Sequence, residues 1–159
     1  MEIRDAVVGD APEACAVMRR SIAELCGADH GNDPAILAGW LANKTPDTVS
    51  VWIGRPDAST LVAVQSGAIV AVGMVTDAGE ILLNYVSPDS RFRAVSRTLL
   101  AALEARAAER GAGQSRREST ETAYRFYRAN GYAEDGAPTG KFGMASGFRM
   151  AKSLASRRA

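Results

Sequence analysis

The sequence has only two cysteines and one histidine among its 159 residues. Cys15 and Cys26 are too few for the disulfide framework of a small secreted protein. Both fall within helical patterns, so we expect them in or near the core. Cys26, His30 and Asp33 are spaced loosely like metal ligands, but one histidine and one cysteine are a poor set for zinc. We therefore expect no metal site.

The sequence also lacks an excess of charge of either sign. It has 19 basic and 18 acidic residues, a formal net charge of +1, which provides no broad positive field for nucleic acid or an anionic membrane. Long apolar runs are absent, so no segment is expected to span a membrane. The N-terminal stretch MEIRDAVVGD is too acidic and too short in apolar length for a signal peptide. We expect a cytoplasmic protein without nucleic-acid or membrane partners.

Length and composition are those of one ordinary globular domain. With 47% hydrophobic and 23% charged residues, a chain of 159 residues builds a single core. No linker or internal repeat interrupts it. We therefore expect one domain over residues 1–153 and a flexible tail over residues 154–159.

The clearest local pattern is a strand followed by a long helix. Residues 81–86 form an apolar run of strand length, and Pro88 helps to end it because proline lacks a backbone donor. Residues 95–107 then carry apolar side chains at every fourth position, which predicts an amphipathic helix. Gly111 provides the stop.

Such a strand–turn–helix junction is a potential anion site. The first N–H groups of a helix are unpaired and lie at the positive end of its dipole, which suits phosphate. Arg91 and Arg93 in the turn add positive charge that can reach phosphate oxygens. Many α/β proteins contain the same junction with no ligand, so a purely structural role is the alternative.

Residues 86–100, VSPDSRFRAVSRTLL, resemble motif A of the GCN5-related N-acetyltransferases (GNAT). The family pattern is V-x-P-x-x-[RQ]-x-x-G-x-[GA]-x-x-L, and its loop holds the pyrophosphate of acetyl-CoA. This sequence departs from it at Ala94 and Ser96, where small glycines are usual. Glycine lets the backbone approach the phosphates without a Cβ atom in the way. The Ser96 hydroxyl can donate to a phosphate oxygen.

Residues 119–132, STETAYRFYRANGY, resemble motif B of the same family, whose core is A-x-x-F-Y-x-x-x-G-[FY]. The two motifs occur in the family's order. The resemblance implies an α/β fold, the single-domain GNAT fold, in which helices flank a mixed, mostly antiparallel, twisted sheet. It extends over most of the chain.

The resemblance also implies the site. In GNAT enzymes the central strand and its neighbour splay apart, and the pantetheine arm of acetyl-CoA pairs with the exposed strand edge. The cofactor-binding residues implied in this way are Asn84, Tyr85, Val86, Arg91, Phe92, Arg93, Ala94, Val95, Ser96 and Thr120. Tyr127 matches the family's tyrosine that donates a proton to the departing sulfur, and a phenol is protonated at neutral pH. The alternative is that Tyr127 only forms an aromatic core pair with Phe126.

No general base is evident. Glu80 begins the central strand and is a candidate that would act through water. Asp29, His30 and Asp33 belong to a polar stretch between the first two helices, which in this family borders the acceptor site. We interpret His30 as a solvated loop residue.

The remaining elements are predicted from local patterns. Asp10 and Glu13 have the spacing of a capping box at the start of the first helix. Residues 45–54 fit a helix or a strand, and Thr45 followed by proline favours the helix. Residues 114–118, where the family has a strand, contain no apolar side chain, which an edge strand tolerates and a buried strand does not. We further expect a first strand near Ile3, a helix after Asp33-Pro34, a hairpin over residues 61–64 and 69–75, and a last strand over residues 148–152.

The function implied by the resemblance is N-acetyl transfer. Acetyl-CoA is the co-substrate, and the acceptor is a primary amine of an unidentified molecule, with a small molecule favoured over a protein. The alternative is a catalytically weak or inactive CoA-binding or sensing module, which Ala94, the polar residues 114–118 and the missing base favour. A GNAT-shaped interaction domain without a cofactor is a third reading. Homodimers are common in the family, so a homodimer is an open expectation.

Overall fold

A computed structural model describes residues 1–91, 94–137 and 147–154 of the chain. Phe92 and Arg93, part of the loop expected after residue 135 and most of the expected tail lie outside the described residues. The strands are β1 (Glu2–Asp5), β2 (Ala58–Gln65), β3 (Ala68–Thr76), β4 (Glu80–Val86), β5 (Gln114–Ser119), β6 (Ala133–Glu134) and β7 (Phe148–Ser153). The helices are η1 (Val8–Asp10), α1 (Ala11–Leu25), α2 (Gly27–His30), α3 (Pro34–Leu41), α4 (Pro46–Ile53), η2 (Pro88–Ser90), α5 (Val95–Glu109) and α6 (Tyr124–Ala129).

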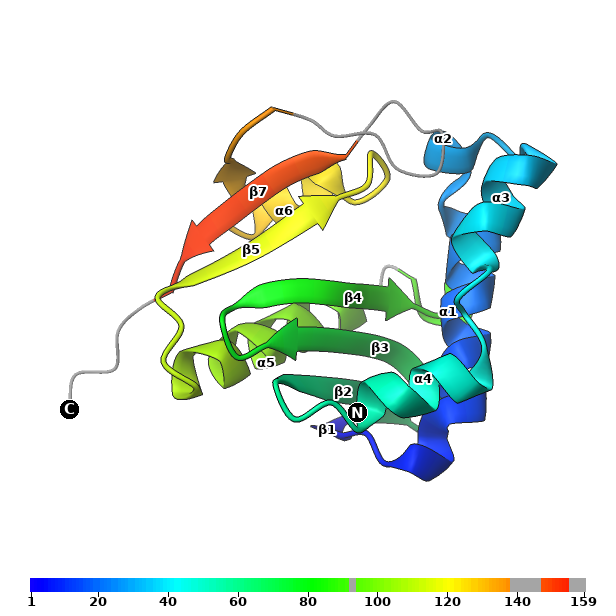
Figure 1. Cartoon of the computed structure of the whole chain (residues 1–159), viewed down its shortest axis with the longest axis horizontal. Coiled ribbons are helices and arrows are strands. Elements are labelled where there is room, and N and C mark those ends of the chain that lie inside the picture. Colours follow the sequence, from blue (N-terminus) through cyan, green and yellow to red (C-terminus); the bar gives the residue numbers. More distant parts are fainter. Residues whose placement is uncertain (92–93, 138–146, 155–159) are drawn as a thin grey trace.

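The strands form one sheet in the order β1-β2-β3-β4-β5-β7-β6 (Figure 1). All neighbours are antiparallel except β4 and β5, which are parallel because α5 crosses over between them. This confirms the mixed, mostly antiparallel α/β fold. β4 and β5 pair only at Glu80–Arg116 and Ile81–Arg117, and beyond these pairs the two strands diverge (Figure 1).

Two hydrophobic layers cover the two faces of the sheet. On one face α5 packs through Leu99 and Leu103, both fully buried, against residues of β2 and β3. The approach is close: a Cβ atom on Gly73 of β3 would lie 2.6 Å from a Leu103 methyl group. On the other face α1 and α4 pack through residues such as Met18 and Val49. The predicted amphipathic helix therefore buries the stripe that its spacing indicated.

Most local predictions are confirmed, with boundaries shifted by a few residues. The Thr45 side chain accepts a hydrogen bond from the Thr48 N–H, so residues 46–53 are helical rather than extended. Asp33 caps α3 in the same way through the N–H groups of Ala35 and Ile36. The predicted hairpin is β2–β3, and the predicted last strand is β7.

The predicted capping box at Asp10 and Glu13 is wrong. The Asp10 carboxylate turns back to accept from the Val7 N–H and from the Arg4 guanidinium, at 2.8 Å each. Glu13 instead accepts from the backbone N–H of Ile69 at the start of β3. The two carboxylates therefore accept from Arg4, Val7 and Ile69 instead of from the backbone N–H groups at the start of α1.

The prediction of a solvated loop histidine is also wrong. His30 ends the short helix α2 and is only 1% exposed. Its Nε2 donates to the Ile22 carbonyl at 2.8 Å, while its Nδ1 accepts from the Asn32 N–H at 3.0 Å. The ring also meets Trp40 edge-on. Both ring nitrogens are thus bonded in the neutral tautomer, and His30 serves the structure.

The polar residues 114–118, which suit an edge strand better than a buried one, lie in β5, which is inside the sheet between β4 and β7. It pairs along its whole length with β7 but only at two positions with β4. The side chains that it buries are small: Ser115 is fully buried and its hydroxyl bonds the Tyr132 hydroxyl at 2.7 Å. A strand without apolar residues is therefore tolerated inside this sheet because most of its β4-facing edge is left open.

Candidate active site

A cavity of about 570 Å³ opens where β4 and β5 diverge. The described residues that the resemblance assigned to cofactor binding and to proton donation all line it: Asn84, Tyr85, Val86, Arg91, Ala94, Val95, Ser96, Thr120 and Tyr127. They come from β4, the turn before α5, the first turn of α5, the loop after β5 and α6. Segments distant in the sequence thus converge on one cavity. Phe92 and Arg93 lie outside the described residues.

The turn before α5 forms one end of this cavity. Ala94 adopts the left-handed conformation, with φ +60°, and immediately precedes the first helical residue. This is the conformation that glycine adopts freely and that alanine adopts at a cost. Ser96 and Arg97 line the cavity from the first turn of α5. Arg97 was not among the predicted residues, although an arginine beside unpaired helix N–H groups is a recognisable anion signal.

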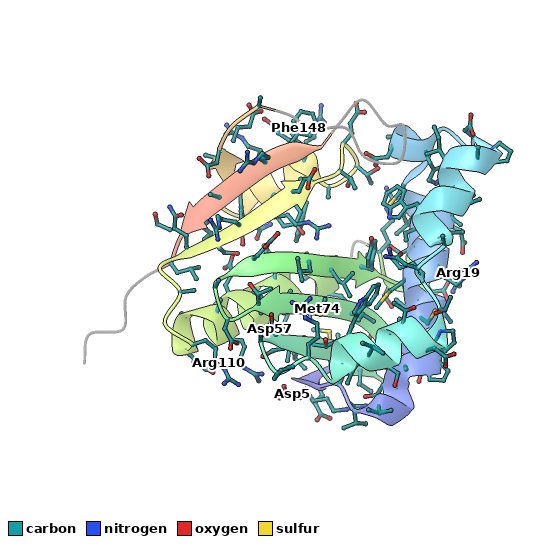
Figure 2. The ribbon with its side chains drawn as sticks, viewed as in Figure 1. Asp5, Arg19, Asp57, Met74, Arg110 and Phe148 are labelled. Atoms are coloured by element: carbon teal, nitrogen blue, oxygen red, sulfur yellow. The ribbon has the colours of Figure 1, made fainter. Side chains whose placement is uncertain are left out.

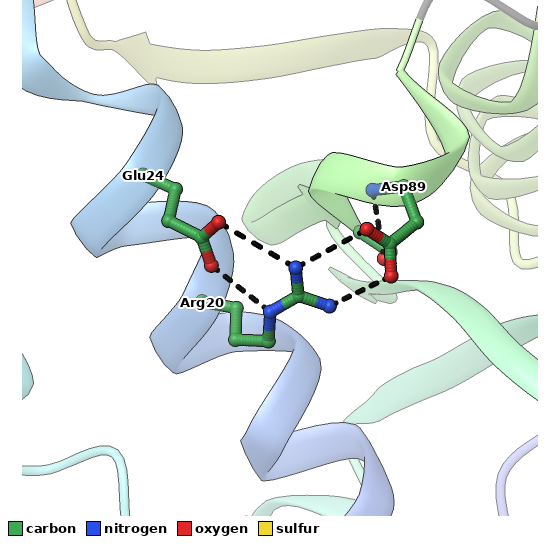
Figure 3. Close-up of polar contacts among 4 residues, drawn as sticks. Arg20, Glu24 and Asp89 are labelled. Carbon is green, nitrogen blue, oxygen red and sulfur yellow. Dashed lines mark hydrogen bonds and ion pairs between the residues drawn. The ribbon is translucent and has the colours of Figure 1, made fainter.

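An ion-pair network ties this turn to α1 (Figure 3). The Arg20 guanidinium donates to Asp89 in η2 at 2.9 and 3.2 Å and to Glu24 at 2.9 Å. The bonds from Arg20 lower the pKa of the Asp89 carboxyl. Asp89 also donates its N–H to the Ser87 hydroxyl. α1 and η2 are thereby held together immediately before the loop that carries Arg91.

Tyr127 packs among aromatic rings and also lines the larger cavity. Its side chain is 1% exposed, and its ring meets those of Phe126 and Tyr132 edge-on, with 5.2 Å between centroids in each pair. Its hydroxyl oxygen accepts a hydrogen bond from the Asn84 side-chain amide at 2.9 Å. Because Asn84 is the donor, the hydroxyl proton of Tyr127 is available for an acceptor inside the cavity.

A second cavity, of about 350 Å³, adjoins the first. Its aromatic wall is formed by Trp40, Trp52 and Tyr85, and its charged groups include Glu80 and Glu118. Sequence reasoning did not place the two tryptophans in a site, because each reads as an ordinary apolar residue of an amphipathic helix.

The helices that wall this second cavity are anchored to α1. Arg19 lies on α1 (Figure 2). Its guanidinium donates to the carbonyl oxygens of Leu41 and Lys44, at 3.1 and 2.9 Å. The Lys44 ammonium lies over the Trp52 ring, 5.8 Å from its centroid. These contacts hold the segment between α3 and α4 beside the end of the sheet.

Arg117 of β5 lies between the two cavities and lines both of them. Its Nη1 donates to the Ile81 carbonyl of β4 at 3.1 Å, and its guanidinium carbon lies 5.9 Å from the centre of the Tyr127 ring. Its Nε is buried and has no hydrogen-bond partner within the described residues. Sequence reasoning missed Arg117, because a polar stretch carries no signal that distinguishes one arginine from the next.

Of the three carboxylates considered as a base or as neighbours of the acceptor site, one lines a cavity and two do not. Glu80 lines the second cavity and is exposed. Asp29 and Asp33 line neither of the two cavities. Asp29 instead accepts hydrogen bonds from the N–H groups of Glu121 and Thr122, which holds α2 against the turn that leads into α6.

Cys26 lines the first cavity but is not a reactive thiolate. Burial, reinforced by the nearby Asp29 carboxylate, raises the pKa of its thiol to about 12. Both cysteines are buried free thiols, as expected from their helical positions.

Within residues 1–91, 94–137 and 147–154, no cluster of acidic, histidine or cysteine side chains has the geometry of a metal site. In the same ranges no helix is long and apolar enough to cross a membrane.

Comparison with known proteins gives a consistent result. Residues 38–154 match the family model described as "Acetyltransferase (GNAT) domain". A search of curated proteins finds no match. Among solved structures, a GCN5-related N-acetyltransferase from Rhodopseudomonas palustris, described as "Aminotransferase, Class-II", is 26% identical, with 96% of this chain and 95% of that chain covered and a TM-score of 0.86.

Two further solved structures share the fold at lower identity. The PaiA N-acetyltransferase of Thermoplasma acidophilum in complex with coenzyme A is 19% identical, with 96% of this chain and 98% of that chain covered and a TM-score of 0.83. An aminoglycoside 6'-N-acetyltransferase complexed with coenzyme A is 15% identical, with both chains covered in full and a TM-score of 0.73.

Proposed function

Because the chain belongs to the GNAT family of acetyltransferases, we propose that it transfers an acetyl group from acetyl-CoA to a primary amine of a small molecule. The observation that carries the proposal is the position of Tyr127. Its hydroxyl accepts from Asn84 at the open end of β4 and lines the larger cavity. A proton donor is thus held beside an exposed strand edge, as thioester aminolysis requires.

The residues of the larger cavity fit acetyl-CoA. β4 has no β5 partner beyond Ile81, so the backbone near Asn84 and Tyr85 can pair with an extended amide-bearing arm. At the other end, the first turn of α5 with Ser96 and the Arg91 side chain suits a pyrophosphate. The left-handed turn at Ala94 supports this fit, since it is the conformation that a glycine would adopt there.

The chemistry needed is a balanced exchange of two bonds. Bound acetyl-CoA supplies an activated acetyl group as a thioester. A carbon–nitrogen bond forms to the acceptor amine, the carbon–sulfur bond breaks with its electron pair left on sulfur, and a proton passes from nitrogen to solvent. In this proposal Tyr127 donates its hydroxyl proton to the sulfur and regains one from solvent. Asn84 keeps the Tyr127 oxygen oriented for that donation.

The smaller cavity is the proposed acceptor site. Its volume of about 350 Å³ suits a small molecule, and its aromatic wall can hold the carbon skeleton. Glu80 and Glu118 can hold the ammonium group of an amine, although the cations Lys44, Arg55 and Arg117 line the same cavity. Glu80, exposed at the rim, is the candidate to accept the amine proton through water.

The decisive experiment replaces Tyr127 with Phe. Binding of acetyl-CoA is measured by calorimetry, and turnover is measured with a panel of small primary amines. We expect Tyr127→Phe to lower turnover by about a hundredfold or more while the dissociation constant of acetyl-CoA changes little, because only the proton donor is lost. Tyr124→Phe is the matched control, since Tyr124 is on the same helix and lines neither cavity.

Each other outcome has a definite meaning. Full turnover by Tyr127→Phe would contradict the assigned role of the tyrosine. Binding of acetyl-CoA by the wild-type protein with no turnover of any amine would favour the CoA-binding or sensing module. No binding at millimolar acetyl-CoA would overturn the proposed function. Thermal unfolding of each variant checks that loss of the bond to Asn84 has not unfolded the protein.

A further inference from the structure

The two cavities meet at three described residues, Tyr85, Arg117 and Thr120, which line both of them. If acetyl-CoA enters from one side and the amine from the other, the reacting atoms meet beside these residues. Only Arg117 among the three carries a formal charge at neutral pH. The centre of the proposed reaction is therefore next to a guanidinium cation.

The charge of Arg117 is not matched by an anion among the described residues. Within the described ranges no carboxylate lies within ion-pair distance of its guanidinium. In the part of the chain that the structure describes, its contacts are neutral, namely the Ile81 carbonyl and the face of the Tyr127 ring, and its buried Nε has no partner there. Partly buried charges without a counter-ion are costly, and proteins usually pair them. The site is thus arranged to receive negative charge.

The field of Arg117 already acts on the groups around it. Burial raises the pKa of the Tyr85 hydroxyl on β4, and Arg117 partly opposes that rise. Arg117 also partly opposes the rise that burial causes in the thiol pKa of Cys26, which lies between α1 and α2. Both are neutral acids whose ionised forms are anions. Arg117 therefore favours an anion at several points of the cavity wall.

We propose that Arg117 stabilises the thiolate of coenzyme A as the carbon–sulfur bond breaks. The inference rests on the proposed acetyl transfer, which leaves the electron pair of that bond on sulfur. It divides the work at the leaving group between two residues. Arg117 offsets the negative charge while it develops, and Tyr127 then supplies the proton, so the products are the amide and the neutral thiol.

The test uses coenzyme A itself and needs no acceptor. Dissociation constants are measured by calorimetry from about pH 6 to about pH 10 for coenzyme A and for desulfo-coenzyme A, in which hydrogen replaces the thiol. Desulfo-coenzyme A has no titrating thiol, so the ratio of the two constants cancels the pH dependence of the protein's other groups. Those facing the site are Tyr85, Cys26 and Tyr127, with Arg91 and Arg97 at the phosphate end.

A cation beside the sulfur lowers the thiol pKa in the complex, so the thiolate binds more tightly than the thiol. We expect the affinity for coenzyme A, relative to its desulfo analogue, to rise about tenfold or more as pH increases across this range. Arg117→Gln is expected to abolish the rise, and Arg117→Lys, which keeps the charge, to retain most of it. Arg116→Gln is the control, since Arg116 is exposed on the same strand and lines neither cavity.

The outcomes separate this inference from the proposed function. An affinity ratio that does not change with pH in the wild-type protein would overturn the role of Arg117 and leave acetyl-CoA binding intact. The same conclusion holds if Arg117→Gln behaves like the wild type. Failure of the wild-type protein to bind coenzyme A would overturn both. Thermal unfolding of Arg117→Gln shows whether loss of the bond to Ile81 has unfolded it, and a wild-type ratio that does not change with pH overturns the role of Arg117 in either case.

Discussion

Ala94 occupies a backbone position that would suit glycine better, so Ala94→Gly is expected to stabilise the protein. Its φ of +60° and ψ of +7° lie in the left-handed region. An L-residue with a Cβ atom loses roughly 1–2 kcal/mol there relative to its ordinary conformations. Glycine avoids that cost, but its freer unfolded chain takes back about 0.4–1 kcal/mol. The net gain is about 1 kcal/mol.

The same chemical change has the opposite effect nearby, which provides a matched control. Ala101 is exposed in the middle of α5, where glycine is less favourable than alanine by about 1 kcal/mol. For a domain of this size, 1 kcal/mol shifts the melting temperature by about 2–4 °C. Ala94→Gly should therefore melt about 2–4 °C above the wild type, and Ala101→Gly a similar interval below it.

Scanning calorimetry on the three proteins without ligand measures both shifts. Calorimetric binding of acetyl-CoA then tests whether the Cβ atom of Ala94 also limits the approach of the phosphates, in which case Ala94→Gly binds more tightly. A melting temperature of Ala94→Gly equal to or below that of the wild type would refute the strain argument. Equal affinity for acetyl-CoA would leave the stability argument standing and remove only the contact with the phosphates.

Two further predictions concern positions outside the cavities. Gly79 has a φ of +95°, and a Cβ atom there would lie 2.0 Å from the Gln114 carbonyl oxygen, so Gly79→Ala should lower the unfolding free energy by more than about 2 kcal/mol in urea. Gly113→Ala, with open space around the new methyl group, should change it little, and equal effects would contradict the steric reasoning. The hydrogen bond from Arg4 holds the pKa of Asp10 below its ordinary value of 3.8, so this contribution to stability is complete above that pH and is lost as the pH falls through the lower, folded-state value. We expect the unfolding free energy, measured with urea, to fall less between neutral and acid pH in Asp10→Asn than in the wild type. If the two proteins lose the same amount of stability, Asp10 is not coupled to folding.

Short-range patterns in the sequence were enough for the elements that carry the site. The fourth-residue spacing of residues 95–107 predicted α5, because a helix with one apolar stripe must bury it. Thr45 predicted the start of α4, because a capping side chain bonds its own next turn. Where a side chain had a better partner outside its own helix, local reasoning failed. Asp10 with Arg4 and Glu13 with Ile69 are two examples.

The sequence by itself determined the fold family, the strand–turn–helix unit and the tyrosine of the site, because each depends on residues close together in the chain. Only the tertiary structure decided what surrounds that tyrosine. The bond from Asn84 and the guanidinium of Arg117, which has no counter-ion among the described residues, arise where β4 and β5 separate. The two tryptophans of the smaller cavity are brought there by α3 and α4. Arg116 and Arg117 are indistinguishable as letters. They differ because alternate side chains of a strand point to opposite faces, and only one of these faces meets both cavities.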